Sequence, residues 1–311
     1  MKIMCPISNI EELARFAAYD IGEMYFGIDN KNLIVNNRRP DYRCNFSYDK
    51  EELEQLFKYA EDKNLKLYVA FNSLVNDENT SESIIEEMDY CIQHGVKRFI
   101  IADINLMLTC KKSFGSDIEI VLSTCMPVYN QYAIDFYRNL GIKRIVLPRH
   151  ITLSKMEKLV QDNKDMEFEV LIKNARCINE DGLCGFEHSL GRFSSLMEGG
   201  CCQLNYTVKV HGADSFDDIT NKIMIKRFEC IRGDFINACG ACYIKKLSEI
   251  GISSLKLVGR EFTAERKTRD LKFLQDCINH TYLSDEDYKC YVKNNYFETY
   301  GRKCEPSQCY Y

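Results

Sequence analysis

Hydrophobic positions along the first two-thirds of the chain recur in one rhythm: a short apolar run, a polar turn, then an amphipathic segment. The apolar runs are rich in Ile, Val, Phe and Tyr, which is typical of strands buried on both faces of a parallel sheet. We therefore predict seven strands, at residues 2–5, 23–28, 66–72, 98–103, 119–123, 144–147 and 167–172.

The amphipathic segments between these runs predict helices that cross from one parallel strand to the next. Ser8-Asn9 supplies a helix-start signal, and Gly95 and Gly141 stand where a helix would end in a left-handed residue. The predicted helices cover residues 10–19, 49–62, 81–94, 106–112, 131–140 and 153–161.

An eighth unit appears late in the chain, with a strand at 254–258 between helices at 243–249 and 265–280. Eight units favour an α/β fold of the (β/α)8 TIM-like barrel type, with an open doubly wound sheet as the alternative. The chain has no Gly-x-Gly-x-x-Gly and no Gly-Lys-Ser/Thr loop, which argues against dinucleotide or nucleotide binding through those motifs.

The rhythm breaks in a long insertion after the seventh predicted strand. We assign residues 1–280 to the barrel, including this cysteine-rich insertion at 173–242, and residues 281–311 to a C-terminal extension outside it. Alternating or apolar runs inside the insertion predict short strands at 203–210 and 223–230. In a barrel, segments that leave the carboxyl ends of strands build the active site, so the insertion is where we expect function.

Composition adds one anomaly, because 16 of the 311 residues are cysteine. The first residues lack the pattern of a secretory signal, and no apolar stretch is long enough to cross a membrane, so we expect the cytoplasm. In that reducing compartment a cysteine cluster points to metal binding or catalysis rather than to disulfides. The net charge of −5 gives no global basic footprint for nucleic acid, although a local basic groove is compatible with it.

Cysteines that are scattered singly along the chain are expected to be small buried hydrophobes. A concentrated set lies in or beside the insertion: Cys177, Cys184, Cys201, Cys202, Cys239 and Cys242. Four thiolates suit zinc or an iron–sulfur cluster, and plain thiols are the third alternative. A zinc ribbon would show two Cys-x2-Cys pairs, whereas only Cys239 and Cys242 have that spacing, so the dispersed set favours a cluster. Three cysteines of the extension form a possible second site: Cys290, Cys304 and Cys309.

A series of short motifs follows one order along most of the chain. They are Cys5-Pro6, Met24-Tyr25-Phe26-Gly27, Asn45-Phe46, Tyr68-Val69, Ala102-Asp103, Leu122-Ser123-Thr124, Val146-Leu147-Pro148-Arg149 and Leu255-Lys256-Leu257-Val258-Gly259-Arg260. In this order they resemble peptidase family U32.

This resemblance implies a cofactor. Some members of the family are oxygen-independent hydroxylases that carry a four-cysteine [4Fe-4S] cluster and act on ubiquinone precursors or RNA bases, with prephenate as the suggested oxygen donor. Matched position by position, the ligands would be Cys177, Cys184, Cys201 and Cys239, with Cys202 and Cys242 as spare candidates. The resemblance also makes a small-molecule substrate, and a related U32 chain as heterodimer partner, expectations for this protein.

The chain departs from the family pattern at several positions. The family's His-Gly before the first cysteine is Lys173-Asn174 here, its Arg-Glu is Arg149-His150, its Tyr-Ser-Gly is Glu180-Asp181-Gly182, and the glutamate of its Lys-Ile-Glu-Gly-Arg is Val258. These changes argue against a hydrolytic site of carboxylates and histidine, and they leave the family's usual hydroxylation substrates open.

Three residues beside the predicted cysteine site are candidates for catalysis. The planar fork of Arg149 suits a carboxylate-bearing small molecule, with a surface salt bridge as the alternative. His150 is a candidate proton donor, since the ordinary pKa of histidine is about 6.5. Lys173 would offset cluster charge or contact substrate, or else be a solvated lysine.

Three functions from different classes follow. The first is a [4Fe-4S] redox enzyme that carries out oxygen-independent hydroxylation or related oxygen transfer. The second is a peptidase, although the sequence shows no recognisable nucleophile–histidine or His-Glu-x-x-His arrangement. The third is a non-catalytic partner subunit whose cluster or zinc is structural.

Overall fold

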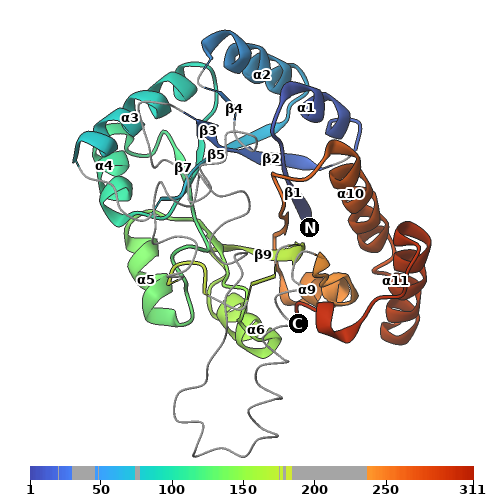
Figure 1. Ribbon diagram of the computed structural model, residues 1–311. Helices are drawn as coiled ribbons and strands as arrows, with labels where there is room; N and C mark the ends of the chain where they lie inside the picture. Colours follow the sequence, from blue (N-terminus) through green and yellow to red (C-terminus); the bar gives the residue numbers. More distant parts are fainter. Residues whose placement is uncertain are drawn as a thin grey trace, which may run out of the picture.

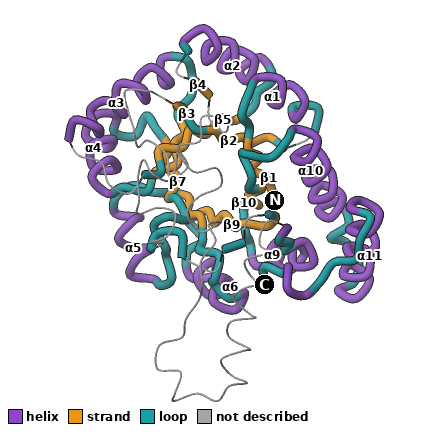
Figure 2. The backbone as a smooth tube through the Cα atoms, viewed as in Figure 1, coloured by secondary structure: helices purple, strands orange, loops and turns teal. Residues whose placement is uncertain are grey.

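The structure is a computed structural model that describes residues 1–19, 21–29, 46–47, 49–73, 78–174, 176–177, 180–183 and 237–311. Within these residues, eight parallel strands close into a barrel (Figures 1 and 2). In order along the chain they are β1 (Lys2–Pro6), β2 (Gly22–Phe26), β5 (Lys66–Phe71), β6 (Arg98–Ile101), β7 (Glu119–Leu122), β8 (Arg144–Val146), β9 (Glu167–Lys173) and β10 (Ser254–Leu257).

Each barrel strand pairs with its neighbour in sequence, and β1 pairs with β10 to close the ring, with Lys2 opposite Ser254. This confirms the predicted TIM-like barrel and excludes the open sheet. The long insertion follows β9, which is the seventh barrel strand, as predicted. The predicted strands at 203–210 and 223–230 lie outside the described residues.

Helices surround the barrel (Figure 1), because each carries one apolar face that packs onto the strands. They are α1 (Ile10–Phe16), α2 (Lys50–Asp62), α3 (Glu78–Gln93), α4 (Ile104–Phe114), α5 (Gln131–Asn139), α6 (Leu153–Asp162), α9 (Ile244–Ile250) and α10 (Ala264–Asn279). Asn9, Asp103 and Thr263 each accept a backbone hydrogen bond at a helix start. No helix in the described part is long and apolar enough to cross a membrane.

Alternation along the strands divides the core into two layers. One layer joins the outer faces of the strands to the helices and includes Met24 and Phe26. The other contains Tyr25, Tyr68 and Leu171, which come from different strands and meet inside the barrel. The singly scattered cysteines Cys5, Cys91, Cys110, Cys125 and Cys277 are buried, as predicted, whereas Cys44 and Cys230 lie outside the described residues.

Charged side chains also enter the core, near the amino ends of the strands. Glu23 and Glu169 are both completely buried, and Arg144 is 2% exposed. Arg144 donates to both carboxylate oxygens of Glu23, at 2.8 and 3.0 Å, while Lys256 donates to Glu169 at 2.8 Å. The barrel is therefore closed at this end by buried ion pairs as well as by apolar packing.

The C-terminal segment both flanks the barrel and returns to it. Helix α11 (Asp285–Tyr300) lies beside α10 on the outside (Figure 1). After a short 3-10 helix, η5 (Pro306–Gln308), the chain turns back, and Tyr310 is buried in the interior layer. The sequence interpretation placed this whole segment outside the barrel, and for Tyr310 it was wrong, because backbone pairing to residues around Cys239 guides the tail inward.

Candidate functional site

The candidate site lies where β8 and β9 end, at the edge of the barrel where parallel-strand enzymes assemble their active sites. Arg149 follows β8 by three residues, and Lys173 is the last residue of β9. Cys177 lies shortly after β9, while Cys239 precedes a 3-10 turn, η4 (Ala241–Tyr243), and α9. Separate segments therefore carry the predicted side chains to one end of the barrel.

Arg149 is held in place by the carboxylate of Asp181, a residue for which the sequence predicted no role. Its Nε donates to Asp181 Oδ2 at 2.7 Å, its side chain is 10% exposed, and a second guanidinium nitrogen donates to the Tyr310 hydroxyl at 3.3 Å. Burial favours the neutral form, but the Asp181 carboxylate keeps the pKa of Arg149 above its ordinary value. Arg149 is thus a fixed, permanently charged group rather than a surface side chain.

The loop that carries Asp181 is fixed against the end of β7. Thr124 donates to Asp181 at 3.4 Å, and the Tyr129 hydroxyl donates to Glu180. A Cβ on Gly182 would lie 2.2 Å from the Cys125 carbonyl oxygen, so only glycine allows this approach. The Glu-Asp-Gly sequence that replaces the family's Tyr-Ser-Gly therefore keeps the one residue that the packing requires.

Lys173 is buried rather than solvated, with 2% of its surface exposed. Its Nζ donates to Asn174 Oδ1 at 3.2 Å and lies 4.9 Å from the centre of the Tyr300 ring. Its backbone forms an antiparallel bridge with Cys239. Burial lowers the pKa of Lys173, while the neighbouring Cys239 and Asp270 act in the opposite direction.

Two of the four predicted cluster ligands belong to the described chain. Cys177 is partly exposed and lies close enough to Arg149 to contribute to the raised pKa of that guanidinium. Cys239 is also partly exposed, and burial raises the pKa of its thiol, although Lys173 opposes this shift. Cys184, Cys201 and the spare candidate Cys202 lie outside the described residues.

Cysteines of the C-terminal segment approach the same place. Cys309 forms a parallel bridge with Cys239, and Arg176 donates to the Cys309 carbonyl oxygen at 2.5 Å. Burial raises the pKa of Cys242 to about 11, with Cys239, Cys304 and Cys309 adding to the shift. The sequence grouped Cys304 and Cys309 with Cys290, but Cys290 is exposed on α11. Among the described residues, no three His, Cys, Asp or Glu side chains are grouped as a metal site.

The donor chemistry fits a thiolate-bound metal or cluster as far as the described residues reach. Cys177 and Cys239 come from separate elements at one end of the barrel, and three cationic side chains, Arg149, Lys173 and Arg176, accompany them. His150 is exposed, so a role as proton donor stays a prediction.

The turn out of β9 depends on Asn174, which has a φ of 68° in the left-handed region. Its side chain donates to Asp270 at 2.7 Å and to the Val258 carbonyl oxygen at 3.3 Å. Asparagine tolerates this backbone conformation better than other residues with a side chain, so it can replace the family's glycine here.

We expect Asn174→Leu to lower the free energy of unfolding by about 2–4 kcal/mol, because it combines backbone strain with the loss of buried hydrogen bonds. Asn174→Gly should lose less, since glycine removes the side-chain bonds without the strain. Urea unfolding of the two variants measures the difference. Equal stabilities would contradict the importance of the left-handed conformation.

Comparison with known proteins places the chain in a family. A family model described as peptidase family U32 matches residues 8–307. The chain belongs to this family. A solved U32 peptidase structure superposes with a TM-score of 0.52 at 10% identity, covering 83% of this chain and 93% of that one, which supports the shared barrel fold.

Curated relatives of this U32 chain have different names. It is 26% identical over 269 residues to tRNA hydroxylation protein P1 of Bacillus subtilis. The aligned region covers 83% of this chain and 58% of that protein. It is 25% identical to an uncharacterized protease of Methanocaldococcus jannaschii, over 96% of this chain and 69% of the relative. It is 24% identical to a collagenase of Porphyromonas gingivalis, over 83% of this chain and 61% of the collagenase. The chain thus spans about 58–69% of the length of these relatives.

Proposed function

We propose that the protein binds a [4Fe-4S] cluster through Cys177, Cys184, Cys201 and Cys239 and acts as an oxygen-independent hydroxylase or a related redox enzyme. The observation that carries this proposal is the position of Cys177 and Cys239, on separate segments at the carboxyl end of the barrel, beside the largely buried Arg149 and the buried Lys173. Such a cluster would supply one-electron chemistry at this end of the barrel.

The surrounding residues suit that role electrostatically. Thiolate ligands bring negative charge into a partly buried site, and Lys173 and Arg149 lie where they would offset it. Asp181 and Tyr310 fix the Arg149 guanidinium, whose planar fork suits the carboxylate of a small acid such as prephenate, the proposed oxygen donor. Burial raises the pKa of Tyr310 to about 12, so its hydroxyl keeps its proton at neutral pH.

The names of the relatives support a base in RNA as the group that is hydroxylated, since several of them are tRNA hydroxylation proteins. A small-molecule substrate is the second possibility. We also propose a related U32 chain as a partner.

The described histidines give little support to the peptidase alternative. His94 and His280 each bond through Nδ1 to a backbone carbonyl oxygen of the preceding helical turn, at 2.8 and 2.7 Å. His94 directly follows α3 and His280 directly follows α10, so both lie on the outer layer of the barrel. Only His150, among the described histidines, follows the carboxyl end of a strand.

Metal analysis of protein purified without oxygen tests this proposal. We expect brown protein with about four iron and four sulfide per chain, and an electron paramagnetic resonance signal after reduction, since a cubane cluster on four cysteines has this content. Iron-free protein, or stoichiometric zinc in its place, from a preparation that loads a known iron–sulfur protein would overturn it.

A further inference from the structure

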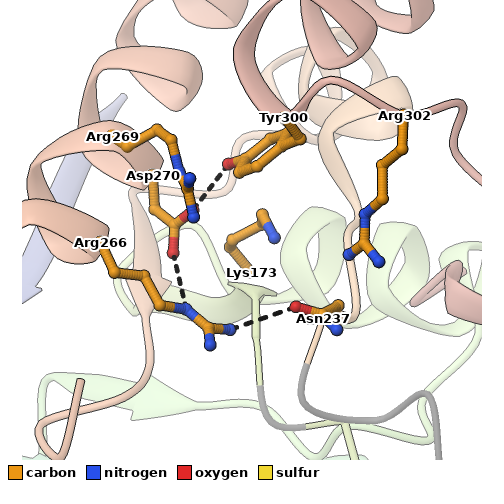
Figure 3. Close-up of a pocket in the computed structure, with 7 residues that line it drawn as sticks. All are labelled: Lys173, Asn237, Arg266, Arg269, Asp270, Tyr300 and Arg302. Atoms are coloured by element: carbon orange, nitrogen blue, oxygen red, sulfur yellow. Dashed lines mark hydrogen bonds and ion pairs between the residues drawn. The ribbon is translucent and has the colours of Figure 1, made fainter. Parts of the chain in front are cut away.

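A polar pocket of about 250 Å³ lies between the end of β9, the first turns of α10 and the end of α11. Lys173 lies in the middle of its lining side chains (Figure 3), with Arg266 and Asp270 of α10 on one side and Arg302 on the other. The pocket is smaller than the roughly 300–1,000 Å³ of drug-sized ligand sites, so it suits a small group.

The charges around this pocket do not balance. Lys173, Arg266, Arg269 and Arg302 line it with positive charge, whereas Asp270 is the one carboxylate among its lining residues. Asp270 is already engaged, because it accepts hydrogen bonds from the Tyr300 hydroxyl at 2.6 Å and from Asn174 at 2.7 Å. Such an excess of cations over a small polar cavity favours an anion.

Burial sharpens this imbalance. Lys173 is 2% exposed, and within the described part its Nζ has no carboxylate within ion-pair distance, only the amide oxygen of Asn174 and the faces of tyrosine rings. Arg266 and Arg302 line the same pocket and add further positive charge beside Lys173. A bound anion would offset this buried positive charge.

The position of the pocket in the barrel indicates which anion. Lys173 ends the seventh barrel strand, and Arg266 and Arg269 belong to the helix after the eighth. Barrels of this type frequently hold phosphate groups in the loops after strands seven and eight. Four cations from three parts of the fold also match a phosphate, which has several acceptor oxygens and up to two charges, better than one carboxylate.

We propose that this pocket binds the phosphate group of an anionic ligand, either a small phosphate ester or the backbone of an RNA. The site needs no metal, although it shares Lys173 with the proposed cluster site, so the arginine side chains are the ones that test it separately.

Isothermal titration calorimetry of the full chain with inorganic phosphate, at constant ionic strength, tests the pocket. Arg269→Ala and Arg302→Ala should each weaken phosphate binding about tenfold, because each removes one charge-assisted contact from an exposed side chain. Lys272→Ala is the matched control: it removes an exposed cation from the same helix, outside the pocket, and should leave the affinity unchanged. Iron-free protein should also bind phosphate, and both arginine variants should weaken that binding, because the arginines do not depend on the cluster.

Two further titrants distinguish the sources of the phosphate. Binding of a nucleoside 5′-monophosphate that both arginine variants weaken indicates a small phosphate ester. If only a short RNA binds, and the slope of log K against log salt concentration falls by about one in each arginine variant, the ligand is a nucleic-acid backbone. The proposal is overturned if neither phosphate ligand binds, if citrate binds where phosphate does not, or if Lys272→Ala weakens binding as much as the pocket variants.

Discussion

Replacing Arg144 with methionine should lower the free energy of unfolding by about 3–5 kcal/mol, because it removes the buried partner of Glu23 and leaves that carboxylate only the half-exposed Lys2 as a cation. Arg144 lies in the barrel interior, where Glu23 is completely buried and accepts two of its hydrogen bonds. It also lies 3.6 Å from Glu169, another completely buried carboxylate. Urea unfolding monitored by circular dichroism measures the loss.

Arg15→Met provides the matched control for this substitution. Arg15 pairs with Glu265 at 3.0 Å, but the two side chains are 46% and 75% exposed. An exposed pair contributes at most about 1 kcal/mol, so Arg15→Met should change stability little. Similar losses in the two variants would show that the buried network is not what stabilises this end of the barrel.

The pH dependence of stability provides a second readout of the same network. Burial raises the pKa of Glu23, but hydrogen bonds and charge attraction from Arg144, with a smaller contribution from Lys2, outweigh it and lower the pKa to about 2. Because the folded-state pKa lies below the unfolded one, this stabilisation is present above about pH 4.5 and is lost as the pH falls toward 2. In Arg144→Met only the half-exposed Lys2 still opposes the burial effect, so acid unfolding should begin at a higher pH than in the parent.

Replacing Cys239 with alanine should reduce the iron content of anaerobically purified protein from about four per chain to less than about one, since a cubane cluster needs four ligands. The fold should survive, because Cys239 pairs with the tail through its backbone: its N–H donates to Gln308 and its carbonyl oxygen accepts from Tyr310. Iron and sulfide assays, together with thermal unfolding of the same preparations, separate loss of cofactor from loss of fold.

Other cysteine variants decide which thiols bind the metal. Cys177→Ala should behave like Cys239→Ala, whereas Cys290→Ala changes an exposed thiol on α11 and should keep full iron content. Cys304→Ala tests the tail and Cys242→Ala tests η4, because Cys304 and Cys309 lie close enough to Cys239 and Cys242 to raise the pKa of both thiols. If these two variants lose the metal while Cys177→Ala keeps it, the metal belongs to Cys242 and the tail cysteines and the proposed ligand set is wrong.

Much of the fold could be predicted from local pattern. Strands buried on both faces are apolar almost throughout, and helix starts carry their own capping residues, such as Asn9 and Asp103, so both signals lie within a few residues. Helix α11 was not predicted, because its buried face is formed largely by Tyr288 and Tyr296, and tyrosine gives a weak apolar signal since it carries a polar hydroxyl.

The sequence by itself determined the barrel, the place of the cysteine-rich insertion after the seventh strand, and the family to which the chain belongs. Only the tertiary structure decided which residues contact Arg149 and Lys173. Asp181 lies 32 residues from Arg149, and Tyr310 lies 161 residues from it. Arg266 of the pocket lies 92 residues from Asn174. Such contacts leave no periodic pattern in the sequence. They form because closure of the barrel brings together the ends of distant strands and the returning tail.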